Sequence, residues 1–219
     1  FPAKKILFCQ AHYYALFNPI APSRYAGLGF DRVACQSQIA KGFLERVLGF
    51  RDVAVIPCYI DGELFAPRGN AAQIALIPKK LPREAAAIQS VFGLKYPQFS
   101  HVPWQIAENR TEREIAEIFG GSSIVLSLPF LESFGLVPLE AMASGAIVTG
   151  FHGYGGQEYA SADNGFWFPP DHLEEVADAI AHILTGLEKR DPALLAMREA
   201  GFATAARYNK ERTRDALRG

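Results

Sequence analysis

Two carboxylates, Glu132 and Glu140, are the residues whose type and spacing best suit chemistry. The apolar run 124–128 before them predicts a strand that is buried on both faces. A helix is expected over about 136–144, with Gly145 as its C-terminal stop. Since side chains in a helix lean toward its N-terminus, both carboxylates are expected to face the space above that N-terminus.

The turn between strand and helix offers backbone donors to the same space. The amides of Phe134, Gly135 and Leu136 are predicted to form an anion site at the start of the helix, and Gly135 would let a ligand approach the backbone closely. An anion site beside two carboxylates suits a ligand that carries both phosphate and hydroxyl groups, and a nucleotide sugar is one such ligand.

The elements around this segment alternate between strand and helix. Strands are predicted at 5–9, 32–35, 53–56, 73–77, 124–128 and 146–149, and 101–106 is expected to hold a strand and its exit loop. Helix starts are marked by Ser37, by the capping box from Thr111 to Glu114, and by Asp171 with Glu174, whereas Gly120 and Gly121 are expected to stop the helix before the 124–128 strand. The alternation predicts an α/β fold with a Rossmann-like parallel sheet flanked by helices.

The overall composition excludes several classes of protein. In 219 residues, 49% are hydrophobic and 21% are charged, which is typical of a globular protein. The net charge of −1, without a basic block, argues against a nucleic-acid partner. No apolar run approaches the ~20 residues of a membrane span, and no charged-then-apolar leader is seen. Because the chain begins with Phe1, its native start is expected to lie upstream.

Cysteine and histidine give no sign of a metal site. Cys9, Cys35 and Cys58 are an odd and widely spaced set, which favours buried free thiols in a reducing compartment. His12 lies among aromatic residues, where a structural role is expected more often than a place in a cleft.

Three cations follow the strand predicted at 73–77. Lys79, Lys80 and Arg83 lie where that strand ends and the next helix begins, so they oppose the dipole of the helix. A bound anion would relieve this conflict, although a solvated basic turn is the simpler alternative. Residues 58–70 contain turn residues without a period and are interpreted as a linker.

The segment Glu132-Ser-Phe-Gly-Leu-Val-Pro-Leu-Glu140, followed by Ala-Met-Ala-Ser-Gly, resembles the E-x7-E motif of retaining glycosyltransferases of family 4, which have the GT-B fold. The likeness extends over about residues 30–217. It implies a truncated remnant of the N-terminal, Rossmann-like acceptor-side domain at 1–57, a linker at 58–70, the C-terminal donor-binding domain at 71–190, and helices at 191–219 that cross back to the first domain.

The resemblance also implies roles for residues. Glu132 would be the catalytic residue and accept hydrogen bonds from sugar hydroxyls, and Glu140 would accept them from the ribose. The donor-binding residues implied are Lys79, Lys80, Arg83, Ile106, Ser133, Phe134, Gly135, Leu136 and Glu140, with Trp104 as a further candidate beside the base. Pro78 stands where the family commonly has glycine. The family works without a metal, and this sequence has no Asp-x-Asp motif, so no cofactor is expected beyond a nucleotide diphosphate sugar as co-substrate.

The function implied is retaining transfer of a sugar from a nucleotide diphosphate donor to a glycan or lipid-linked acceptor. Polysaccharide biosynthesis in the cytoplasm, or at the inner face of the membrane with peripheral association through a preceding N-terminal part, is the implied setting. Two alternatives stay open, a non-catalytic nucleotide-sugar-binding scaffold module and a GT-B-like sugar-nucleotide epimerase. Only the residues up to Pro57 precede the linker, which predicts donor binding without efficient transfer by this chain alone. The sugar, the base, the acceptor and the oligomeric state do not follow from the sequence.

Overall fold

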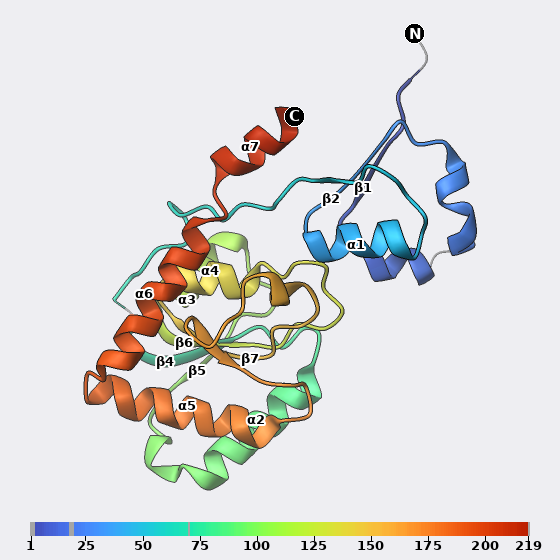
Figure 1. Ribbon diagram of the computed structural model, residues 1–219. Coiled ribbons are helices and arrows are strands. Elements are labelled where there is room, and N and C mark those ends of the chain that lie inside the picture. The colour runs from blue at the N-terminus through green and yellow to red at the C-terminus, as the bar shows by residue number, and fades with distance from the viewer. Residues whose placement is uncertain (1–2, 18–19, 70, 219) are drawn as a thin grey trace.

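The computed structural model describes residues 3–17, 20–69 and 71–218, and Figure 1 shows their arrangement. Three boundary residues of the regions predicted above lie outside the described residues: Phe1, Asn70 and Gly219. The chain forms two parallel sheets that are flanked by helices, so the predicted α/β class is confirmed.

The first sheet is small. Its strands are β1 (Ile6–Cys9), β2 (Arg32–Cys35) and β3 (Ala54–Val55), in the order β1-β2-β3. The short helices η1 (His12–Phe17), η2 (Pro22–Arg24) and η3 (Ala26–Leu28) connect β1 to β2. Helix α1 (Gln38–Arg46) packs on the sheet, and the Ser37 side chain caps it by accepting a hydrogen bond of 3.0 Å from the Ala40 amide, as predicted.

The second sheet has five parallel strands. They are β4 (Ala71–Leu76), β5 (Trp104–Ile106), β6 (Ser122–Ser127), β7 (Ile147–Gly150) and β8 (Gly165–Trp167), in the order β5-β4-β6-β7-β8. From β4 the chain first adds β5 on one side and then returns to add β6 on the other. This reversal makes a topological switch point between the carboxyl ends of β4 and β6, where open α/β sheets bind their ligands.

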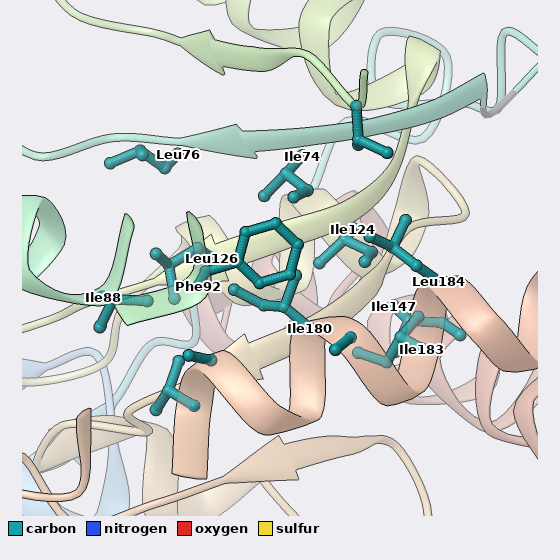
Figure 2. Close-up of a cluster of buried hydrophobic side chains, with 14 of the residues drawn as sticks. Ile74, Leu76, Ile88, Phe92, Ile124, Leu126, Ile147, Ile180, Ile183 and Leu184 are labelled. Atoms are coloured by element: carbon teal, nitrogen blue, oxygen red, sulfur yellow. The ribbon is translucent and has the colours of Figure 1, made fainter. Parts of the chain in front are cut away.

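Helices cover both faces of this sheet. They are α2 (Pro82–Lys95), α3 (Glu112–Gly121), α4 (Val137–Ala143), α5 (Leu173–Glu188) and α6 (Pro192–Ala206), with η4 (Pro97–Phe99) and η5 (Gly155–Glu158) between them. The last helix, α7 (Lys210–Arg218), stands apart from this sheet and lines a cavity with residues of the first sheet (Figure 1). Because side chains alternate along a strand, Ile74 and Ile124 point to α2 and α5, as Figure 2 shows, whereas Ala75 and Val125 face α3 and α4. Both faces are therefore buried, which explains the continuous apolar runs in the sequence.

Three local predictions have clear outcomes. The capping box at Thr111 is confirmed, because its hydroxyl accepts from the Glu114 amide and the Glu114 carboxylate accepts from the Thr111 amide at 2.8 Å. Gly120 and Gly121 end that helix as predicted, because they are its last two residues and β6 follows at once. The Asp171 cap is wrong, because the His172 amide bonds to the Pro169 carbonyl in a turn that makes His172 the residue before α5.

Candidate functional site

A cavity of about 160 Å³ lies at the switch point between β4 and β6. Its lining comes from the segment after β4 and from the end of β6 with the loop that follows: Ile77, Lys79, Lys80, Leu126, Ser127, Leu128, Pro129, Glu132 and Val137. The fold therefore brings together the predicted basic loop and the first predicted carboxylate, 52 residues apart in the sequence.

The polar groups of this cavity are cationic, anionic and neutral. The Lys80 ammonium group forms an ion pair with Oε1 of Glu132, and both side chains are partly exposed. Lys79 is exposed and lines the same cavity. The Ser127 hydroxyl is buried and has no hydrogen-bond partner among the described residues. A buried hydroxyl without a partner is rare, so Ser127 offers a hydrogen bond to a ligand that enters.

Backbone geometry shapes the loop that carries Glu132. Gly135 has φ of +85°, and the Tyr159 hydroxyl donates a 2.6 Å hydrogen bond to its carbonyl oxygen. A β-carbon on Gly135 would lie 3.0 Å from Oε2 of Glu132. The left-handed backbone favours glycine here, and a β-carbon would in addition force the Glu132 carboxylate to shift.

The glycine-rich loop after β7 supports this loop from behind. The Gly155 amide donates a 2.9 Å hydrogen bond to the Glu132 carbonyl oxygen, and a β-carbon on Gly155 would lie 2.2 Å from the Phe134 nitrogen. The Phe134 amide is thus pressed against Gly155. The amides of Gly135 and Leu136, by contrast, have no acceptor among the described residues and remain available to an anion.

Glu140 lies in α4, beside the cavity rather than in its lining. Burial raises the pKa of its carboxyl group to about 7, and the negative charges of Glu112 and Glu132 add to this effect. No described side chain donates a hydrogen bond to it or pairs with it. Near neutral pH it is therefore a half-protonated group that hydroxyl donors would stabilise in the ionised form.

The remaining predicted donor-binding residues are more scattered. Arg83 is exposed in the first turn of α2 and does not line the switch-point cavity. Ile106, at the end of β5, is 47% exposed, and Trp104 packs against the core with its ring 5.8 Å from that of Phe92. None of these three positions belongs to the lining of the switch-point cavity.

Ser133 connects the site to the N-terminal region. Its hydroxyl accepts a 2.9 Å hydrogen bond from the His12 amide and lies 2.7 Å from Nδ1 of His12, and its carbonyl accepts one of 2.7 Å from the Ser37 hydroxyl. His12 is fully buried and its pKa is lowered by burial, which agrees with the structural role expected for it. The Ser133 side chain is therefore occupied by protein partners.

Glu158 has a structural role in the same junction. Its carboxylate accepts a 2.7 Å hydrogen bond from the Ile39 amide in the first turn of α1. Helix amides favour a carboxylate at this end, so the glycine-rich loop is anchored to the first sheet's helix.

Sequence reasoning missed Ser127 and Pro129 as cavity residues. The available signal was their place at the carboxyl end of a parallel strand beside a change in strand order. A larger cavity of about 790 Å³, between the first sheet and α7, is mostly apolar, and Leu136 is the only predicted donor-binding residue in it. The described residues contain no group of three or more His, Cys, Asp or Glu side chains placed to hold a metal ion.

Part of the chain is similar in sequence to known glycosyltransferases. Residues 104–194 match the family described as Glycosyl transferases group 1. An alpha-1,6-glucosyltransferase of Actinobacillus pleuropneumoniae serotype 7 (strain AP76) is 29% identical over 144 residues, which is 59% of this chain and 43% of that protein.

Solved structures show the same fold. A TarM variant of S. aureus, in complex with fondaparinux, alpha-GlcNAc-glycerol and UDP, superposes with a TM-score of 0.77 at 13% identity, over 98% of this chain and 50% of that one. HepE of Anabaena in complex with UDP-glucose superposes with a TM-score of 0.73 at 15% identity, over 98% of this chain and 71% of that one. The chain thus spans about half the length of TarM and less than half of the glucosyltransferase.

The apolar helices in the described ranges are all too short or too polar to pass through a bilayer. The matched region contains the switch-point cavity loop, Glu132 and Glu140, and both sheets belong to the shared fold. Residues 104–194 are therefore similar to the glycosyl transferases group 1 family, and the α/β fold of the chain matches that of GT-B glycosyltransferase structures.

Proposed function

We propose that this chain is the donor-binding part of a retaining glycosyltransferase, which moves a sugar from a nucleotide diphosphate sugar to a glycan or lipid-linked acceptor. The observation that carries the proposal is the switch-point cavity, where Lys79 and Lys80 meet Glu132. We assign 71–190 to donor binding, 1–57 to the acceptor side, 58–70 to the linker and 191–219 to the returning helices. A contact between α7 and the end of the acceptor-side region supports the last assignment, since the Thr213 hydroxyl donates a 2.8 Å hydrogen bond to the Pro57 carbonyl.

Sugar transfer requires positive groups beside the leaving diphosphate, because negative charge develops on it. When the bond between the anomeric carbon and the diphosphate breaks, its electron pair stays on the diphosphate oxygen. Lys79, Lys80 and the amides of Gly135 and Leu136 would stabilise that charge more strongly than the charge of the intact donor. These groups suit a reaction without a metal ion, and Arg83 could reach the diphosphate from the start of α2.

The carboxylates would act on the sugar and the nucleoside. Glu132 would turn from Lys80 toward the hydroxyls of the donor sugar, and its charge would favour an oxocarbenium-like centre. Glu140 would accept hydrogen bonds from the ribose. Retention of configuration rests on the likeness of the motif from Glu132 to Glu140 to that of retaining enzymes.

The relatives suggest the donor. HepE binds UDP-glucose and TarM binds UDP, and the Actinobacillus relative is a glucosyltransferase, so UDP-glucose is our first choice. Cytoplasmic polysaccharide synthesis is part of the proposal, and the free thiols of Cys9, Cys35 and Cys58 support a reducing compartment.

Titration calorimetry with UDP-glucose and a panel of other nucleotide sugars tests donor binding. Lys80→Met should weaken binding of the best donor by about tenfold or more, because a charge-assisted contact to phosphate is lost. Lys41→Met is the matched control, since Lys41 also forms an ion pair, with Glu45 at 3.8 Å, but is not part of the cavity lining. A folded sample that binds none of these donors would refute the proposal.

Glu132→Gln separates an enzyme from a binding module. In the whole protein it should abolish transfer, whereas donor affinity should be retained or improve, because Lys80 no longer has to leave a carboxylate before it meets the diphosphate. Donor binding without any transfer to lose would instead indicate a scaffold module. Conversion of the free donor into its epimer, followed by NMR, would indicate the epimerase.

A further inference from the structure

A second cavity, of about 420 Å³, lies at the end of the second sheet where its strands begin, whereas the switch-point cavity lies where they end. It borders the beginnings of β4 and β6, at Ala72 and Ser123, and the region where α5 ends and α6 begins. Figure 1 shows these two helices meeting at one end of the molecule. The cavity shares no lining residue with the switch-point cavity, so the proposed donor does not explain it.

Arg198 of α6 is the unusual residue here. Its Nε atom is buried and has no hydrogen-bond partner among the described residues. Its guanidinium group forms no ion pair with any of these residues. Burial lowers its pKa, and the neighbouring Glu199 compensates only in part. The residue as a whole is partly exposed, but a buried N–H without an acceptor is rare, which indicates that a ligand supplies the acceptor.

The other charged groups of the cavity leave an excess of one positive charge. Arg190 is a second cation in the lining, and Glu188 is the one lining carboxylate. Arg190 holds a left-handed backbone, with φ of +54°, at the end of α5. Two guanidinium groups and one carboxylate together favour a ligand with a single negative charge.

The rest of the lining is apolar or already satisfied. Leu184, Leu187 and Leu195 form much of the wall, with Val102 at the sheet. The Ser123 hydroxyl donates to the Gln73 carbonyl at 3.4 Å, so it does not add a free donor. A ligand must therefore bring an apolar body as well as its charge.

We propose that this cavity is a binding site for a small organic monoanion, in which a carboxylate on an apolar body is held by Arg198 and Arg190. The planar guanidinium group matches a carboxylate with two parallel hydrogen bonds. The volume of about 420 Å³ falls in the range of small-molecule sites, and it accommodates a chain such as that of hexanoate.

The test is calorimetric titration of the folded chain with hexanoate, at low salt. Hexanoate should bind saturably, and hexanol and acetate should each bind at least about tenfold more weakly, because one lacks the charge and the other lacks the apolar body. Arg198→Met, which keeps the apolar stem, should weaken hexanoate at least about tenfold. UDP-glucose binding in the same variant should be unchanged, so failure of this site and failure of the donor site are distinguishable.

Two further variants keep the test decisive. Arg190→Gly removes the second cation and also relieves the left-handed backbone, so it should fold at least as well as the wild type and bind hexanoate several-fold more weakly. Arg113→Met is the control, since Arg113 is exposed on α3 outside the cavity. Absence of saturable hexanoate binding, or equal binding by the wild type, Arg198→Met and Arg190→Gly, would overturn the proposal.

Discussion

Replacing Glu140 by glutamine should stabilise the protein in a pH-dependent way. The pKa of the Glu140 carboxyl group is raised from 4.5 to about 7 in the folded chain, mainly by burial. Its favourable contribution to stability is complete below the unfolded pKa of 4.5, and it is lost as the pH rises from there to about 7. Ionised Glu140 then costs about 3 kcal/mol, from 1.36 kcal/mol for each pKa unit.

Glutamine imitates the protonated form and avoids this cost. The free energy of unfolding, from urea titrations, should rise by about 3 kcal/mol in Glu140→Gln at pH about 8 and by about 1 kcal/mol at pH about 5. Glu117→Gln is the control, because Glu117 is exposed on α3. A gain that is equal at both pH values, or larger at the lower one, would show that Glu140 is not held near neutrality by its surroundings.

The same pKa predicts how donor binding responds to pH. If the ribose hydroxyls donate to ionised Glu140, binding releases a proton near neutral pH, and donor affinity falls by up to about tenfold per unit below the pKa. Calorimetry in two buffers with different ionisation enthalpies counts the protons released. Glu140→Gln should bind the donor more weakly and release none. Proton release that persists in the variant would assign the titration to another group.

Two further substitutions test how the loop that carries Glu132 is held. Gly155→Ala puts a methyl group 2.2 Å from the Phe134 nitrogen, so the loop must shift, and both the thermal midpoint and the donor affinity should fall; donor affinity equal to wild type would contradict this. Ser133→Ala leaves the His12 amide and Nδ1 without their buried partner and should cost about 1–3 kcal/mol of unfolding free energy, measured in urea. Ser90→Ala, at an exposed helix position, should cost far less, and equal losses would show that the His12 contact is not stabilising.

The sequence by itself determined the features that depend on neighbours along the chain. The apolar run before Glu132, the short helix with Glu140 and the capping box at Thr111 were all predictable, since periodicity and capping are local. The α/β class followed from their alternation. The Asp171 cap failed because a turn at Pro169 competed for the same backbone, and side-chain type alone does not decide such competition.

Only the tertiary structure decided which distant groups meet. The strand order placed β4 beside β6 and so brought Lys80 to Glu132 and left the Ser127 hydroxyl buried in the cavity between them. The contact between His12 and Ser133 joins residues 121 positions apart. The raised pKa of Glu140 likewise depends on burial by several elements. Residue spacing along the chain does not predict these contacts or this pKa, because desolvation and long-range pairing exist only once the sheets and helices have packed.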